Sequence, residues 1–305
     1  MKADKSQINS LYAHQKQETM NNNVTEEKIQ TDQFDHIGHS LIYHGKYNDK
    51  AYLMKLHKED LEEMPGKLEQ LAKDNNYGKI LAKIPTWAQP LFQQYGYTQE
   101  AYIPGYYNGT ENLFFMARYR KEERREVPEN PLNTLTNLLY HTNEKTTAKP
   151  ASELTIKIAN VEHVQEMAKL YQTVFETYPF PVSDPAYLQE TMLAGKVIYI
   201  GAWKKGKLIG MCSAEVDKTN KNAEMTDFAV LAEFRGHNLA QLLLTATEQE
   251  MKKQNYRTLY SIARLISPGI NKTFIRQGYR FSGILRKNTQ IAGSIESMNV
   301  YYKNI

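Results

Sequence analysis

Cysteine is nearly absent from this sequence: Cys212 is the single one among 305 residues. One cysteine excludes an intramolecular disulfide and any metal site built from several cysteines, and it is typical of proteins in a reducing compartment. Long apolar runs are missing as well. No segment approaches the roughly 18 residues of a membrane-spanning helix, and the polar N-terminus lacks the apolar stretch of a signal peptide. We therefore expect a cytoplasmic protein with no membrane partner.

The sequence also has little excess of one charge. It contains 38 Lys and Arg against 34 Asp and Glu, a net charge of +4. Over this length the excess is too small to bind nucleic acid by itself, so any anionic ligand must be held by a local site. His36, His39 and His44 have no clustered carboxylate or cysteine partners, and we predict no metal site.

The length predicts about two domains, at roughly 150 residues each. Residues 1–33 are rich in Lys, Gln, Asn, Glu and Thr, and we predict a disordered tail there. A second polar stretch, 122–153, contains three prolines and is predicted to be a linker with one short helix. It separates a first domain, 34–121, from a second, 154–305.

In the second domain, the apolar spacing predicts an alternation of helices and strands. Two helices come first, then a hairpin, a strand, a long helix, a strand, a further helix and two terminal strands. The order predicts an α/β fold in which helices cover both faces of a mixed sheet.

The segment Arg235-Gly-His-Asn-Leu-Ala240 lies where a strand gives way to the long helix. The first backbone N–H groups of a helix have no intrahelical partner and attract phosphate, and Arg235 could add charge-assisted hydrogen bonds. Such a turn is also compatible with an ordinary helix entrance, so the segment by itself leaves both interpretations open.

The order of elements and this turn resemble the acetyl-coenzyme A dependent N-acetyltransferase (GNAT) superfamily. Its diphosphate turn reads [Gln or Arg]-x-x-Gly-x-[Gly or Ala]; Arg235 and Ala240 fit, whereas Asn238 replaces the glycine. Asn tolerates positive φ better than most residues, so we expect the turn to survive. The resemblance implies a GNAT fold, with a mostly antiparallel sheet, and acetyl-coenzyme A as cosubstrate without a metal.

Longer motifs resemble one family within this superfamily, the β-lysine N6-acetyltransferases. They are 222–230, 267–271 and 293–302 in the second half, and Gly105-Tyr-Tyr-Asn-Gly109 with 114–118 in the first. The resemblance covers about 35–305. It implies an acyltransferase that acetylates the terminal amine of β-lysine, a small-molecule amine, to give the compatible solute Nε-acetyl-β-lysine.

An aliphatic ammonium has a pKa of about 10.4 and must lose a proton before it attacks a thioester. Our first candidate for the base is Glu224, six residues before Val230, the spacing that the resemblance implies. Asp227 is a second candidate, expected on the opposite face of the strand if alternation holds, and Glu215 is a third. Each could instead be a salt-bridged or solvated sheet position.

The resemblance assigns the remaining roles. The backbone N–H of Val230 stabilises the thioester oxygen, and a bulge frees the N–H and C=O groups of Phe228 and Val230 for the pantetheine arm. The residues expected to bind the coenzyme are Phe228, Ala229, Val230, Arg235, Gly236, His237, Asn238, Leu239, Ala240, Asn271 and Phe274.

Two roles stay open. Phe274 stands where the family places a proton-donating tyrosine, so Tyr260, Tyr279 or water would protonate the thiolate, or it departs unassisted. A substrate carboxylate needs a cation, and the sequence does not choose between Arg264, Arg276 and Arg286.

The first domain echoes the second, since Phe92-Gln-Gln-Tyr-Gly-Tyr97 parallels Phe274-Ile-Arg-Gln-Gly-Tyr279. We expect a truncated GNAT-like unit. The acidic residues of 54–66, where a diphosphate turn would lie, predict that it binds no coenzyme. Its aromatic residues serve either core packing or the wall of a substrate cleft.

Other functions remain open from the sequence. The amine could be another diamine or amino acid, or a protein lysine, and a non-catalytic acetyl-coenzyme A sensor would share the coenzyme contacts. Homo-oligomers are compatible with the sequence and not established by it.

Overall fold

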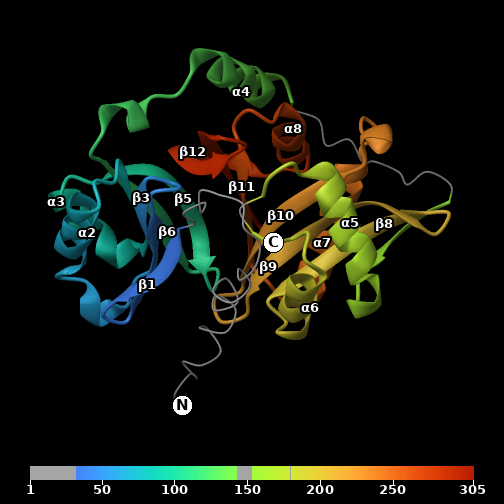
Figure 1. The fold of residues 1–305 in the computed structure, drawn as a ribbon, viewed down its shortest axis with the longest axis horizontal. Coiled ribbons are helices and arrows are strands. Elements are labelled where there is room, and N and C mark those ends of the chain that lie inside the picture. Colours follow the sequence, from blue (N-terminus) through green and yellow to red (C-terminus); the bar gives the residue numbers. More distant parts are fainter. Residues whose placement is uncertain (1–31, 143–152, 179) are drawn as a thin grey trace, which may run out of the picture.

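The computed structural model describes residues 32–142, 153–178 and 180–305. The tail predicted for 1–33 lies outside the described residues except for its last two. Two sheets dominate the described part, with α4 lying across the top against α8 (Figure 1). None of the helices in these ranges is long and apolar enough to cross a membrane.

The first sheet has six strands in the order β1-β2-β3-β4-β6-β5. Helices α2 (Met64–Asp74) and α3 (Gln89–Gln94) cover one of its faces through the buried side chains of Leu53, Leu68 and Phe92. The strands are β1 (Gln33–Ile37), β2 (Ser40–Gly45), β3 (Lys50–Lys55), β4 (Lys79–Pro85), β5 (Thr98–Tyr107) and β6 (Glu111–Tyr119).

The second sheet has seven strands in the order β12-β13-β11-β10-β9-β8-β7. They are β7 (Leu154–Ile158), β8 (Val197–Lys204), β9 (Lys207–Asp217), β10 (Asn222–Val230), β11 (Thr258–Arg264), β12 (Arg280–Ile291) and β13 (Ser294–Asn304). Only β10 and β11 run parallel, and all other neighbours are antiparallel. This is the mixed, mostly antiparallel α/β sheet that the resemblance implies.

Helices cover both faces of the second sheet. In Figure 1, α5 (Val164–Val174) and α6 (Pro185–Leu193) lie in front of it and α7 (Leu239–Lys253) lies behind, where α8 (Pro268–Arg276) packs against α7. The local sequence explains where α6 begins. Asp184, its N-cap residue, accepts a hydrogen bond from the N–H of Ala186, and Pro185 stands in the first turn.

The two sheets share one strand order. Reading β8-β9-β10-β11-β13-β12 beside β1-β2-β3-β4-β6-β5 matches each strand, including the parallel pair β3–β4 beside β10–β11. The helix α2 occupies the place of α7, but its first turn contains Pro65, and both Met64 and Pro65 are buried. Because proline has no backbone N–H, this helix start offers fewer donors to a phosphate than the exposed turn before α7, and the absence of a coenzyme site in the first unit stays a prediction.

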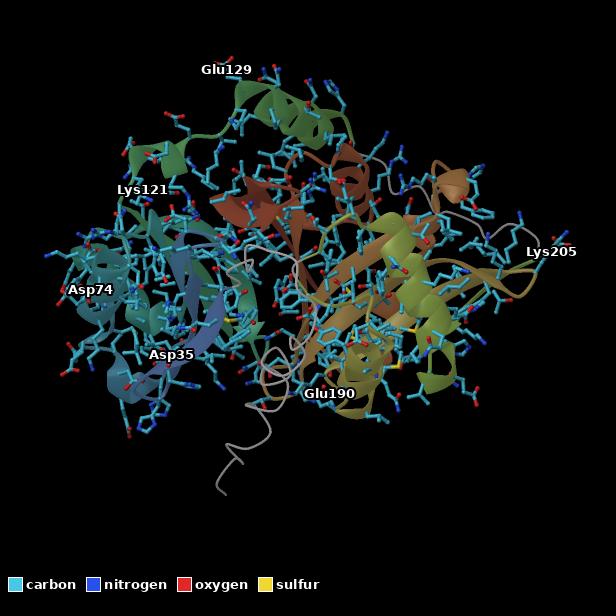
Figure 2. All side chains as sticks on the ribbon, in the orientation of Figure 1. Asp35, Asp74, Lys121, Glu129, Glu190 and Lys205 are labelled. Atoms are coloured by element: carbon cyan, nitrogen blue, oxygen red, sulfur yellow. The ribbon has the colours of Figure 1, made fainter. Side chains whose placement is uncertain are left out.

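The segment 122–153, predicted to be a linker, contains two helical pieces in its described part. The short 3-10 turn Glu122–Arg125 precedes α4 (Glu129–His141), and its remaining residues 143–152 lie outside the described ranges. Further 3-10 turns are Lys58–Asp60, Thr86–Ala88, Val161–His163 and Ala232–Phe234. Charged side chains such as Asp74, Glu129 and Lys205 point outward from the molecule (Figure 2).

The two units share a hydrophobic core. The second face of the first sheet, with Leu81 and Phe115, packs on Tyr260, Val300 and Tyr302 of the second sheet. The front face of the second sheet therefore has two covers, α5 and α6 over one half and the first unit over the other. We call the boundary between these two covers the seam. Tyr260 belongs to the core shared with the first unit, and Glu224 is its partner on the adjacent strand β10, so both residues lie along the seam.

Buried cations fasten a bulge of β12 to the first unit. Three successive carbonyl groups of the bulge each accept a hydrogen bond of 2.6 Å from a different side chain. Lys79 binds the carbonyl of Arg286, Arg124 that of Lys287, and Lys50 that of Asn288. Lys79 is also paired with Glu100 at 2.7 Å. Because burial makes unpaired charges costly, these contacts fix the position of the two units relative to each other.

The close approach of β5 and β12 predicts the effect of a single methyl group. A Cβ added at Gly283 of β12 would lie 2.0 Å from the carbonyl oxygen of Glu100 in β5. We expect Gly283→Ala to lower the free energy of unfolding by about 1–3 kcal/mol, because two backbones would have to part. The measurement is urea unfolding. Gly269→Ala is the matched control: nothing lies near its added Cβ, and the helix α8 should be unaffected or stabilised.

Candidate active site

The candidate site begins where β10 and β11 part. The two parallel strands pair at only three positions, from Asn222 opposite Thr258 to Glu224 opposite Tyr260. Beyond these positions β10 continues to Val230 and β11 to Arg264 without pairing to each other. Parallel strands that part in the middle of a sheet expose backbone N–H and C=O groups to an inserted ligand.

A bulge in β10 accompanies the parting. The register against β9 shifts between Thr226 and Ala229, and Asp227 adopts the left-handed conformation with φ 53°. The bulge predicted near Phe228 is therefore present. An L-residue in this conformation is strained, and Asp is among the few side-chain-bearing residues that tolerate it.

The bulge corrects the expectation for Asp227, which was placed on the strand face opposite Glu224. Its carboxylate accepts a hydrogen bond of 2.5 Å from the hydroxyl of Ser213. Ser213 pairs with Thr226, and Glu215 pairs with Glu224, so these side chains share one face. The strict alternation behind the expectation fails because the left-handed residue turns the side chain to that same face.

Asp227 is held by hydroxyl groups rather than free to act. Tyr178 donates a short hydrogen bond to the same carboxylate that Ser213 binds, and the side chain is only 7% exposed. Burial raises the pKa of Asp227, and the hydrogen bonds of Ser213 and Tyr178 oppose this shift. Asp227 therefore stabilises the bulge, and its two hydroxyl partners leave Glu224 as the stronger candidate for the base.

Glu224 is the carboxylate best suited to accept a proton. Burial in the seam raises its pKa to about 7, while the positive charge of Lys83 and hydrogen bonds from Tyr260 and the N–H of Ile262 limit the rise. The group nevertheless retains partial exposure to solvent. A base with a pKa near neutrality and access to a ligand meets the requirement for general base catalysis.

Glu215 faces Glu224 across the β9–β10 pair. More than a third of its surface is exposed, yet its withdrawal into the seam, together with the negative charges of Glu224 and Asp227, raises its pKa to about 8. No ion pair involves Glu215 within the described ranges. The site thus presents a second accessible carboxylate beside the candidate base.

Val230 lies at the end of β10 with its amide turned toward the parting. The N–H of Leu231 donates to the carbonyl of Ile209, which makes Val230 opposite Gly210 a non-hydrogen-bonded pair. The N–H and C=O groups of Val230 therefore point away from β9. The C=O accepts a hydrogen bond of 3.1 Å from Nε of Arg235, which differs from the expectation that it is free for a ligand.

The turn before α7 has the geometry expected of an anion site. Asn238, the N-cap residue, is left-handed with φ 57°, and Gly236 has φ 80°. The side chain of Asn238 makes no capping hydrogen bond, and residues 235–238 are exposed. His237 is among the exposed residues of the turn, and Ala240 is partly exposed. The side chains of Leu239 and Ala229 are buried, so these two residues can offer only backbone groups to a ligand.

Two residues expected to contact the coenzyme have structural roles instead. Asn271 is 1% exposed, and its amide is saturated: it donates to the carbonyls of Arg264 and Ser267 and accepts from Tyr301. Phe274 is fully buried and stacks on Tyr301. Packing explains both corrections, because α8 turns these side chains into the core behind the sheet.

The three arginines proposed for a substrate carboxylate do not meet at the site. Arg264 is bound by both carboxylate oxygens of Glu296, at 2.5 and 2.8 Å. Arg286 belongs to the bulge of β12 that the first unit fastens, and Arg276 lies in the last turn of α8. Tyr279 is likewise enclosed in the core with Phe274, whereas Tyr260 remains beside Glu224.

The first unit contributes Lys83, which sequence reasoning did not assign, and Tyr106, one of the aromatic residues expected either in core packing or in the wall of a substrate cleft. The ring of Tyr106 lies 5.4 Å from that of Tyr260, and Nζ of Lys83 lies 5.3 Å from the ring of Tyr106. Hydrogen bonds link Lys83 to Tyr106, Tyr106 to Tyr260 and Tyr260 to Glu224. One signal was available: Lys83 is a lone charge inside the apolar run 80–84.

Comparison with known proteins agrees with this geometry. The model of the acetyltransferase (GNAT) family matches residues 164–266. A β-lysine N6-acetyltransferase of Methanococcus maripaludis is 36% identical over 88% of this chain and 97% of its own. The chain belongs to the GNAT acetyltransferase family. A β-lysine N6-acetyltransferase of Methanosarcina mazei is 30% identical over 79% of this chain and 96% of its own. The N-acetyltransferase YodP of Bacillus subtilis is 34% identical over 77% of this chain and 85% of its own.

As a member of this GNAT family, the chain is an acetyl-coenzyme A dependent N-acetyltransferase. Its residues fit that cosubstrate. The exposed turn at 235–238, with its left-handed residues, suits the diphosphate of the coenzyme, and the parted strands suit the extended pantetheine arm. Within the described ranges, no group of three or more His, Cys, Asp or Glu side chains is arranged to hold a metal ion.

The left-handed conformation of Asn238 predicts how substitutions there affect coenzyme binding. Glycine adopts positive φ without strain, so Asn238→Gly should bind coenzyme A as the unmodified protein does. Asn238→Val should weaken binding about tenfold, because a β-branched residue adds about 1–2 kcal/mol of strain. Isothermal titration with coenzyme A measures both. Equal affinity for the valine variant would remove this turn from the binding site.

Proposed function

We propose that this protein transfers the acetyl group of acetyl-coenzyme A to the N6 amine of β-lysine. The observation that carries the proposal is the seam, where Glu224 and Glu215 are accessible beside the parted strands and can attract a cationic amine. Two relatives named for this reaction match the chain over 88% and 79% of its length.

In the proposed mechanism, Glu224 accepts the proton of the substrate ammonium. Its pKa of about 7 leaves the carboxylate ionised at slightly alkaline pH, when an aliphatic amine is still almost fully protonated. Tyr260 and the N–H of Ile262 hold the carboxylate in place by hydrogen bonds. The neutral amine then attacks the carbonyl carbon of the thioester that bound acetyl-coenzyme A supplies.

In this proposal the N–H of Val230 donates a hydrogen bond to the thioester oxygen as negative charge develops on it. It points into the parting of β10 and β11, and a donor fixed in a site shielded from water stabilises such charge by a few kcal/mol. The hydroxyl of Tyr260, which interacts with Glu224, is our candidate for protonating the departing thiolate, because Phe274 has no proton to give and Tyr279 is enclosed.

The product of this reaction, Nε-acetyl-β-lysine, carries one ammonium and one carboxylate and therefore no net charge. Such a solute can accumulate without disturbing the charge balance of the cell, and we propose that the product serves as a compatible solute in osmoadaptation.

Removing the charge of Glu224 tests its role as base. We expect Glu224→Gln to lower kcat by about 10²–10⁴ while coenzyme A binds with unchanged affinity. In the unmodified enzyme only the ionised carboxylate accepts a proton, so kcat/KM should rise with pH through about 7. The acidic limb should be lost in the variant. A variant with full turnover would assign the base to another group.

Thiol release from acetyl-coenzyme A identifies the substrate. The panel contains β-lysine, α-lysine, ornithine, spermidine and a lysine-containing peptide, and we expect the highest kcat/KM with β-lysine. Mass spectrometry of the product should place the acetyl group on N6. Turnover of the peptide alone would indicate a protein acetyltransferase, and coenzyme binding without release for any amine would indicate a sensor.

A further inference from the structure

Three charged side chains meet at the seam without forming an ion pair. Lys83 comes from β4 of the first unit, and Glu215 and Glu224 come from β9 and β10 of the second. Within residues 32–142, 153–178 and 180–305, none of them has a salt-bridge partner. Charges that are partly withdrawn from water and remain unpaired are costly, and they are typical of sites that complete their pairing with a ligand.

The orientation of Lys83 follows from the register of β4. Ile80, Ala82 and Ile84 face α2 and α3, so Leu81 and Lys83 face the second unit. Lys83 is partly exposed, and its ammonium group rests over the ring of Tyr106, with Nζ 5.3 Å from the ring centroid. An ammonium group has three N–H donors, so this placement leaves Lys83 able to bind an anion as well.

The first unit holds this lysine rigidly against the second. The motif that contains Tyr106 is fastened to the start of β10 and β11: Asn222 donates to the carbonyl of Tyr106 at 3.0 Å, and Thr258 donates to that of Gly105 at 2.7 Å. Each donor is buried. Lys83 is therefore a fixed part of the site rather than a surface side chain that reaches it by chance.

We propose that Lys83 and Glu215 recognise the amino-acid end of the substrate, Lys83 binding its carboxylate and Glu215 its second ammonium group, while Glu224 serves the amine that is acetylated. The inference rests on the proposed function and deepens it, because it names the residues that select the substrate. The first unit thereby supplies part of the specificity.

The charges of β-lysine match this arrangement one to one. The molecule has one carboxylate and two ammonium groups, and the seam offers one lysine and two carboxylates. Glu215 and Glu224 are directly opposed cross-strand partners, whose Cβ atoms lie about 5 Å apart in such pairs. Two flexible carboxylates at this spacing can reach the two amines of one substrate, which four carbons separate.

The test compares three substrates that differ by one charged group. They are β-lysine, 6-aminohexanoate, which lacks the second amine, and 1,4-diaminopentane, which lacks the carboxylate. Assays at pH 9 lie above the pKa of about 7 of Glu224 in the unmodified enzyme, which limits the contribution of its titration to the comparison. The variants are Lys83→Gln and Glu215→Gln. Lys55→Gln is the matched control, because this exposed lysine ends the neighbouring strand β3.

We expect each variant to affect most strongly the substrates that carry the group it binds. Lys83→Gln should lower kcat/KM for β-lysine and 6-aminohexanoate by about 10- to 100-fold more than for 1,4-diaminopentane. Glu215→Gln should lower it for β-lysine and 1,4-diaminopentane by a comparable factor more than for 6-aminohexanoate. Lys55→Gln should match the unmodified enzyme with all three, and coenzyme A affinity should be equal in every variant.

The outcomes separate this inference from the proposed function. If the unmodified enzyme acetylates β-lysine but Lys83→Gln affects all three substrates equally or none, the recognition role is overturned and the proposed function stands. If the unmodified enzyme does not acetylate β-lysine, the proposed function itself is overturned, and the inference with it.

Discussion

The parting of β10 from β11 is the constraint on which the rest of this structure depends. The strands pair through Glu224 and Tyr260 and then separate. Separation removes hydrogen bonds from the centre of a sheet, which is unfavourable unless other groups replace them. On the other side of β10, the left-handed backbone of Asp227 makes the bulge against β9, and the hydroxyls of Ser213 and Tyr178 hold its carboxylate. The amide of Val230 is thereby left for a ligand.

The two units divide the work of one site. The second unit provides the exposed turn at 235–238, the parted strands and Glu224. The first has the same strand order but a proline in the first turn of α2, and it brings Lys83 and Tyr106 next to Tyr260. In our proposal, one copy of a shared architecture binds the coenzyme and the other contributes to the amine site.

The sequence predicted the features that depend on neighbouring residues. The turn at Asn238 was predictable because strand, turn and helix signals are local, and Asn tolerates the left-handed conformation found there. The face of Asp227 was not, because a bulge breaks the alternation on which the prediction relied. Asn271 and Phe274 were assigned by motif position, which does not reveal what a side chain packs against. Lys83 meets the site only through contacts between distant parts of the chain.

The fastening of the two units has a consequence for any attempt to dissect the chain. Expressing the second unit alone would uncover Tyr260, Val300 and Tyr302, which now belong to a shared core, and would leave three carbonyls of β12 without their cationic donors. The first unit alone would be left with Lys50, Lys79 and Arg124 deprived of those acceptors. Although the chain looks like two repeats, we expect the two units to fold and unfold together.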